Sequence, residues 1–242
     1  MKRLLATVIF AVGISSSVHA QTPANEVRSF VGRKFILYGH GAGKVNMADL
    51  SKPVVDGCGT PIEILDASYS DNQIRFDLEN IGSIQLNGNG ANSRAIVACS
   101  GTISANFKLM ISDVRSEDLT AGLETTLGNL LMTPDAFLAF NGIQPAAPST
   151  NIPGKTQPRI LLMIPPQYTD SARKARLQGS VDFSFVVGAD GRIEDPKIVQ
   201  GLGSGLDEQT LRVLPMWRFE PARLDGKPVA TQTKANTVFH LY

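Results

Sequence analysis

The stretch "LPMWRFEPARLDGKPV" (residues 214–229) holds the only tryptophan of a 242-residue chain. Trp217 lies between the end of a short helical pattern and the Asp225-Gly226 turn. An indole at such a junction can cover the helix end against a sheet and bury about 200 Å² of its own surface. We therefore expect Trp217 and Phe219 to be core residues that mark the fold and take no part in binding.

The residues on either side of this stretch predict a small sheet covered by two helices. "SVDFSFVV" (180–187) alternates apolar and polar residues, "GADGRI" (188–193) is a hairpin turn in which Gly191 takes a positive φ, and "IEDPKIVQG" (193–201) returns antiparallel. Pro196 places an edge or a bulge in the returning strand. Helices are expected over "YTDSARKARLQG" (168–179) and, after an Asp207 cap, "EQTLRVL" (208–214). The final strand lies within 230–242. The order of elements is therefore helix, hairpin, helix, strand, which predicts two helices on one face of a small antiparallel sheet.

The first half of the chain favours strands and then helices. Six short runs between Phe30 and about Ile111 are rich in β-formers and are separated by Gly, Asn, Asp and Pro: "KFILYG", "PIEIL", "QIRFDL", "SIQL", "RAIVAC" and "NFKLMI". Residues 21–29 look like a short flexible start. A helix capped by Ser116 is expected to carry Leu119, Leu123, Leu127, Leu130 and Leu131, and a second short helix starts at Thr133-Pro134 and ends at Gly142.

The predicted fold class is therefore α+β, in four segments. Residues 1–20 combine Lys2 and Arg3 with an apolar run and a small-residue cleavage site, which predicts a secretory signal peptide cut before Gln21. A β-rich domain with C-terminal helices spans 26–142, a Pro-, Ala- and Ser-containing linker spans 143–158, and a second domain spans 159–242. Export to an oxidising compartment favours a Cys58–Cys99 disulfide, against two free thiols or a metal site.

Composition and motifs argue against several function classes. The formal net charge of +1 gives no sign of nucleic-acid binding. "GHGAGK" (39–44) has the wrong spacing for a phosphate-binding loop, and the two histidines after residue 20, His40 and His240, lie far apart in the sequence. The sequence nominates no catalytic constellation, so we expect a binding protein that uses no metal or cofactor and is not an enzyme.

Several pieces of the last third occur in a recognisable order. "PQY" (166–168) and Ala172 are followed by "LQGSVDFSFVV" (177–187), "DGRI" (190–193), "WRFEPA" (217–222), "DGKPV" (225–229) and "FHL" (239–241). Together, at these spacings, residues 159–242 resemble the TonB carboxy-terminal domain family. The family usually has proline after the tyrosine, where this chain has Thr169.

The resemblance implies a binding mode. Energy transducers of this family couple an inner-membrane motor to outer-membrane receptors, and their terminal domain captures an extended receptor segment by strand addition. The edge strand is best assigned to residues 230–238, because "TQTKANT" is polar and Lys234 discourages indiscriminate pairing. Gln167 and Tyr168 match the family's region beside the captured peptide, although a helix cap and a core ring explain them equally well. The expected partner-binding residues are Gln167, Tyr168, Thr231, Thr233, Lys234 and Asn236.

Three functions stay open at this point. The first is a periplasmic adaptor that binds an extended segment of an envelope protein, such as an outer-membrane receptor. The second is a genuine energy transducer for nutrient uptake, held in the inner membrane by an uncleaved first helix; Ser15 and His19 reproduce the Ser-x3-His spacing of transducer anchors. The third is an enzyme within 26–142, which would need a polar cleft with perturbed acids. The open edge would also let two copies exchange strands into a homodimer.

Overall fold

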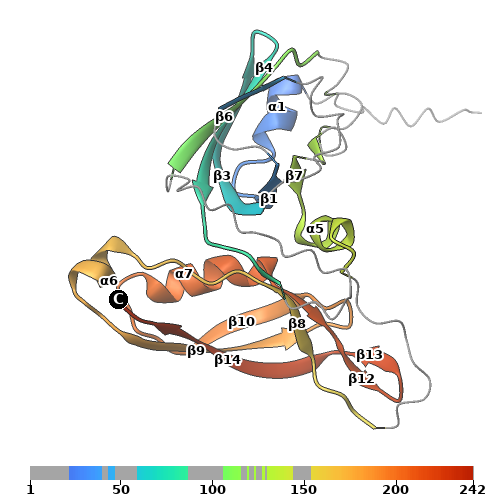
Figure 1. Ribbon diagram of the computed structural model, residues 1–242, viewed down its shortest axis with the longest axis vertical. Coiled ribbons are helices and arrows are strands. Elements are labelled where there is room, and N and C mark those ends of the chain that lie inside the picture. Colours follow the sequence, from blue (N-terminus) through green and yellow to red (C-terminus); the bar gives the residue numbers. More distant parts are fainter. Residues whose placement is uncertain are drawn as a thin grey trace, which may run out of the picture.

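Two β-sheet units follow one another along the chain in the computed structural model (Figure 1). The structure describes residues 22–39, 43–46, 59–86, 106–115, 119, 123, 127–128, 130–143 and 154–241. We call the described residues between 22 and 143 the first unit and residues 154–241 the terminal unit. The fold class is α+β, as predicted, with mostly antiparallel sheets and few helices.

The first unit contains a six-stranded sheet in the order β2-β6-β4-β3-β1-β7. Only the β2–β6 pair is parallel. The strands are β1 (Lys34–Tyr38), β2 (Gly43–Asn46), β3 (Gly59–Ser70), β4 (Gln73–Asn80), β6 (Asn106–Ser112) and β7 (Leu131–Met132). Four of the six predicted runs, "KFILYG", "PIEIL", "QIRFDL" and "NFKLMI", thus supply strands of this sheet.

Alternation along the strands decides which face is buried. In β4, Ile74, Phe76 and Leu78 are fully buried while Arg75 is exposed. Their partners in β6 are Phe107, Leu109 and Ile111, so one apolar face forms across the sheet. Leu119, Leu123 and Leu127, from the predicted leucine-rich helix, pack into the same core.

Several predictions for the first unit need correction. Residues 23–28 form helix α1 (Pro23–Arg28), with Pro at its first turn, where a flexible start was expected. Leu131 lies in β7 and not in the leucine-rich helix, because it pairs with Leu37 of β1. The "SIQL" run gives only β5 (Gln85–Leu86), which pairs with the terminal unit. The signal peptide, "RAIVAC", Cys58 and Cys99 lie outside the described residues.

Helix α5 (Pro134–Phe140) ends the first unit as expected. The Thr133 hydroxyl accepts a hydrogen bond from the Ala136 amide at 3.2 Å, and Gly142 takes a φ of +69° just after the helix. Residues 144–153 of the expected linker lie outside the described residues. From Gly154 the chain is attached to the terminal unit, since Lys155 bridges to Leu224 and the Thr156 amide donates to the Arg223 carbonyl at 2.8 Å.

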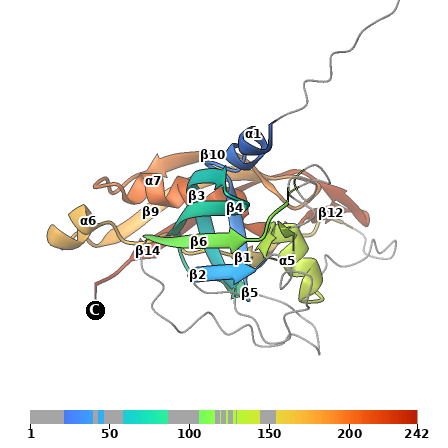
Figure 2. The same ribbon diagram turned by 90° about the horizontal axis from the view of Figure 1, so that it is seen from above.

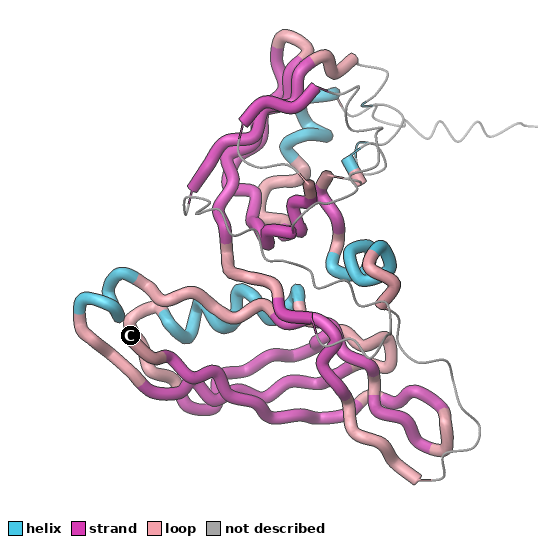
Figure 3. The backbone as a smooth tube through the Cα atoms, viewed as in Figure 1, coloured by secondary structure: helices cyan, strands magenta, loops and turns pink. Residues whose placement is uncertain are grey.

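The terminal unit contains the predicted antiparallel sheet in the order β10-β9-β14 (Figures 1 and 3). Its strands are β9 (Gly179–Val187), β10 (Ile193–Gln200) and β14 (Thr231–Phe239). Val181, Phe183, Phe185 and Val187 are all buried on the face that carries the helices. These helices are α6 (Asp170–Lys174) and α7 (Leu206–Val213), followed by the 3-10 turn η1 (Leu214–Met216).

Two turns confirm their sequence signals. Gly191 has a φ of +80°, and a Cβ built there would lie 2.1 Å from the Phe219 carbonyl oxygen, so only glycine fits. Asp225 and Gly226 both take positive φ and join β12 (Ala222–Leu224) to β13 (Lys227–Val229) as a hairpin.

The start of α7 differs from the prediction. The helix begins at Leu206, and its cap is Gly205, with a φ of +80°. The Asp207 carboxylate instead accepts hydrogen bonds from the Leu202 and Gly203 amides, at 2.8 and 3.1 Å, and so fixes the loop that precedes the helix.

Trp217 and Phe219 are core residues, as predicted. Trp217 is 3% exposed, packs edge-on against Phe183 with ring centroids 6.0 Å apart, and donates a hydrogen bond from Nε1 to the Ile164 carbonyl at 3.0 Å. Phe219, in β11 (Arg218–Glu220), packs on Phe185. The indole therefore seals the end of α7 against the sheet.

A second small sheet was not anticipated. Strand β8 (Arg159–Met163) lies between β11 and β5, so it joins the terminal unit to the first one. Viewed from above, the first unit lies over the middle of the terminal unit, and α6 and the β12–β13 hairpin extend beyond it at opposite ends (Figure 2).

Candidate functional site

Strand β14 forms one border of the terminal sheet. It pairs antiparallel with β9 over nine consecutive residues, Thr231 to Phe239, without a register shift. Among the described residues no strand pairs with its other side. The backbone N–H and C=O groups that point away from β9 are therefore available to a further strand.

The four predicted β14 residues lie on this strand, on alternating faces. Lys234 and Asn236 are exposed on the outer face of the sheet. Thr231 and Thr233 point to the opposite face, where Thr231 is buried and Thr233 half-buried. An incoming strand would thus contact amide and ammonium groups on one side and threonine methyl groups on the other.

Thr231 carries an unsatisfied polar group. Its hydroxyl oxygen is buried and has no hydrogen-bond partner within the described part of the chain. Its carbonyl accepts a hydrogen bond from the Thr233 hydroxyl at 3.3 Å. A buried hydroxyl without a partner costs stability, so packing alone does not explain threonine at this position.

The opposite border of the sheet, β10, is irregular. Its register against β9 shifts between Glu194 and Lys197 and again between Ile198 and Gln200. Asp195 takes a φ of +48°, and Pro196 lacks the N–H that a neighbouring strand would need. The prediction of a bulge or edge at Pro196 is confirmed, and β14 is the only one of the two borders with a regular backbone.

Tyr168 supports the end of β14. Its ring packs edge-on against Phe239, with centroids 5.5 Å apart, and its hydroxyl donates to the Leu177 carbonyl. The Arg173 guanidinium lies 6.0 Å from the centre of the tyrosine ring. Tyr168 is thus half-buried beside the carboxyl end of the edge strand.

Gln167 contacts the first unit. Its side-chain amide donates to the Asn80 carbonyl at 3.2 Å, across 87 positions of sequence. The structure therefore brings Tyr168 next to β14 but turns the Gln167 side chain towards the loop after β4.

Charged side chains of the two units also meet. Arg218, 8% exposed, donates to both oxygens of Asp135 at 2.6 and 3.2 Å, and Arg192 donates to the same carboxylate at 2.7 Å. Burial acts to raise the pKa of Asp135, but the hydrogen bonds and charges of Arg218 and Arg192 outweigh it and hold that pKa below its ordinary value. Sequence patterns gave no sign of this contact, because its partners are 83 and 57 residues apart.

The first unit contains a cavity of about 170 Å³. Its lining is mainly apolar, with the Arg33 guanidinium placed 4.8 and 4.9 Å from the ring centres of Phe30 and Phe35. Among the described residues that line this cavity, none is acidic. In the described ranges, no cluster of three His, Cys, Asp or Glu residues could hold a metal ion, and no helix is long and apolar enough to cross a membrane.

The terminal unit thus defines a class: a small α+β module with two helices on one face of a three-stranded antiparallel sheet and one regular open edge. Residues 164–241 match the family described as Gram-negative bacterial TonB protein C-terminal. The terminal unit is therefore a TonB carboxy-terminal domain, as the sequence motifs predicted.

Relatives and a solved structure match the same part of the chain. Protein TonB of Pseudomonas aeruginosa is 33% identical over 102 residues, which is 41% of this chain and 30% of that protein. Protein TonB of Vibrio cholerae is 30% identical over 96 residues, 36% of this chain and 39% of that protein. The solution NMR structure of the Pseudomonas aeruginosa TonB CTD is 32% identical and covers 36% of this chain and 88% of that chain, with a TM-score of 0.31. The chain therefore spans only about a third of the length of these TonB proteins.

Proposed function

We propose that this protein is a periplasmic binding module that captures an extended peptide segment of an envelope partner by adding it as a strand to β14. The observation that carries the proposal is the nine-residue register of β14 against β9, which leaves an open border free of bulge and proline. Main-chain hydrogen bonds along such a border supply affinity, and the alternating side chains supply selectivity.

The surroundings of β14 fit this role. In Figure 1, α7 lies between the first unit and the terminal sheet, and β14 lies on the side of the sheet away from the first unit. Lys234 and Asn236 would contact the side chains of the captured segment that point outward, and Thr231 and Thr233 those that point inward. Tyr168 would hold the end of β14 through Phe239, while Gln167 would act indirectly, by fixing the segment before α6.

The partner class follows from the family. An outer-membrane receptor segment is the partner that a TonB carboxy-terminal domain implies, and the periplasm is where such a segment would be met. A second copy of the chain could also pair along β14 and form a strand-swapped homodimer. Lys234 disfavours that outcome wherever two copies bring their lysines opposite each other.

The alternative function is that of a complete energy transducer, anchored by an uncleaved first helix. It is favoured by the similarity of part of the chain to proteins called Protein TonB, of which the matches cover 30% and 39%. The mature amino terminus separates the two functions, and mass spectrometry of the protein purified from cells reads it directly. A start at Gln21 supports the adaptor, whereas an intact Met1 supports the transducer.

Strand addition is tested with two neighbouring prolines in the full chain, Thr233→Pro and Lys234→Pro. Consecutive amides on a strand point in opposite directions, so one proline removes a donor to β9 and the other removes an outward donor. The variant whose proline removes the outward donor should keep its thermal stability, because its hydrogen bonds to β9 are intact. We expect this variant to lose its partner in pull-downs from an envelope extract. Thr233→Val keeps the amide and should retain the partner. Unchanged recovery with both proline variants would show that partners do not bind at β14.

A further inference from the structure

The first unit closes a second strand border of the terminal unit. Strand β8 pairs with β11 on one side, and on its other side Leu162 and Met163 pair with Leu86 and Gln85 of β5. Strand β5 therefore adds to β8 within the same chain, as a partner strand would. Two residues of pairing give little stability by themselves, so other contacts must hold β5 in place.

One such contact is a close backbone approach just before β5. A Cβ built on Gly82 would lie 2.7 Å from Ile164 Cγ2 and 2.8 Å from the Pro165 carbonyl oxygen. The segment around it is apolar: Ile81 and Ile84 belong to the same buried cluster as Ile164. At Gly82 the two units approach each other so closely that no side chain fits between them.

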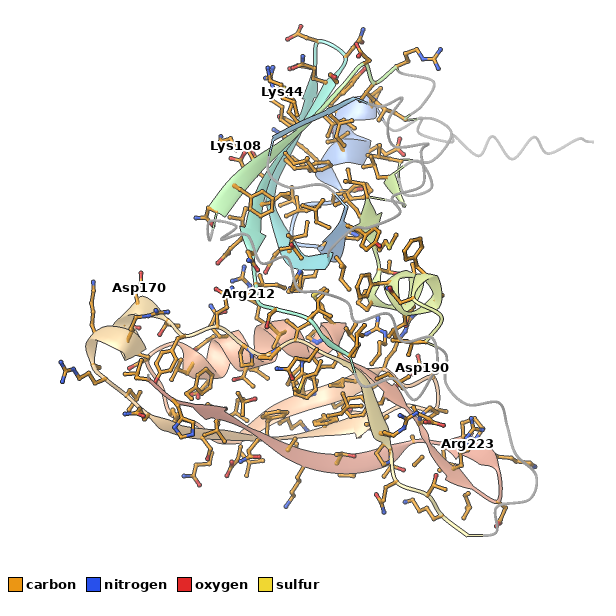
Figure 4. The ribbon with its side chains drawn as sticks, in the orientation of Figure 1. Lys44, Lys108, Asp170, Asp190, Arg212 and Arg223 are labelled. Atoms are coloured by element: carbon orange, nitrogen blue, oxygen red, sulfur yellow. The ribbon has the colours of Figure 1, made fainter. Side chains whose placement is uncertain are left out.

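A second contact is an arginine held by two acids. Arg212 of α7 donates from Nε to Glu63 at 2.5 Å and from its two terminal nitrogens to Glu79 at 3.0 and 2.5 Å. The three side chains are only 18–29% exposed, and Figure 4 shows Arg212 between the two units. Lys34 adds a second cation, 3.6 Å from Glu63.

The two glutamates are an unfavourable pair without that arginine. Glu63 in β3 and Glu79 in β4 are directly opposite each other in the sheet register. Like charges in such positions repel, and burying them without a counter-ion costs further free energy. Arg212 bridges both acids from the other unit and, together with Lys34 beside Glu63, supplies the positive charge that this pair needs.

We propose that the first unit is a built-in cap on the TonB carboxy-terminal domain: β5 closes the β8 border, and Arg212 with Glu63 and Glu79 is one of two charged contacts that hold it, the other being Asp135 with Arg192 and Arg218. Release of the Arg212 contact opens the β5–β8 pairing, while the three-stranded sheet stays folded. This cap does not depend on what binds at β14.

The test measures amide hydrogen exchange by mass spectrometry on the full chain. Arg212→Glu should accelerate exchange in residues 85–86 and 162–163 by about tenfold or more, since exchange follows the free energy of local opening. Residues 179–187 of β9 should keep their protection. The double variant Arg212→Glu with Glu79→Arg exchanges the charges of positions 212 and 79. One cation then lies between two acids again, so slow exchange at β8 should return. The control is Lys108→Glu, which makes the same change in charge at a side chain 83% exposed, and it should leave β8 unchanged.

A second variant probes the cap without altering charge. Gly82→Ala forces a methyl group against the Pro165 carbonyl and should accelerate exchange in the same two segments. The proposal is overturned if β8 exchange stays slow in both Arg212→Glu and Gly82→Ala. It is equally overturned if β9 loses protection together with β8, because the two units would then unfold as one body with no separable cap.

Discussion

Replacing Trp217 by phenylalanine tests a buried polar contact of the terminal unit. The indole N–H donates to the Ile164 carbonyl at 3.0 Å in a position closed to solvent, since Ile164 is 0% and Trp217 3% exposed. Phenylalanine keeps an aromatic ring against Phe183 but leaves that carbonyl unpaired, which costs about 1–3 kcal/mol. A further loss comes from the smaller ring, and Trp217→Ala should cost about 3–5 kcal/mol.

The assay is urea unfolding of the full chain followed by far-ultraviolet circular dichroism. We expect Trp217→Phe to lower the midpoint by about 0.5–1.5 M at unchanged slope. Tyr168→Phe is the matched control, because it also deletes a donor to a backbone carbonyl, that of Leu177, but at a half-buried site. Water can replace the tyrosine hydroxyl, so this change should cost less, about 0.5–1.5 kcal/mol. Equal losses for the two variants would refute the assignment of stability to the buried indole hydrogen bond.

Two further predictions concern single residues of the terminal sheet. Gly191→Ala should destabilise the chain by about 1–3 kcal/mol more than Gly203→Ala. Both glycines have positive φ, but only at Gly191 would the added Cβ lie 2.1 Å from the Phe219 carbonyl oxygen. Thermal unfolding of both variants measures the difference, and equal losses would contradict the steric explanation. Thr231→Val should leave stability unchanged or raise it by up to about 2 kcal/mol, because it replaces an unbonded buried hydroxyl with a methyl group; a loss of stability would mean that the hydroxyl has a partner.

Local patterns predicted the terminal sheet because each of its signals is short-range. The alternation from Val181 to Val187 places every second side chain in the core, and Gly191 marks the turn that follows. The β14 border was predicted from another short-range signal, the polar run "TQTKANT" with Lys234. Asp207 was misread because a carboxylate near a helix start can bond either the helix or the loop before it.

The missed features depend on distant residues. Strand β8 consists of Arg159 and four apolar residues. Its partners, β5 and β11, lie far from it in the sequence, one before it and one after it, so no local period identifies them. Gln167 was assigned to partner binding from its match to the family's region beside the captured peptide, and no local pattern indicates its contact with the Asn80 carbonyl. Helix α1 had a local signal, Thr22 before Pro23, which the polar composition of the segment obscured.

The strand borders of the terminal unit differ in a way that bears on function. An exposed border invites pairing with any extended chain, and proteins suppress this with bulges, prolines, charges or covering segments. Here β10 has two register shifts and Pro196, and β8 is covered by β5. Among the described residues, the only such feature of β14 is Lys234. A partner with a complementary residue can accommodate this charge, whereas a second copy that brings its own Lys234 opposite cannot. A border that stays regular while its neighbours are irregular or covered supports the proposal that β14 receives a partner strand.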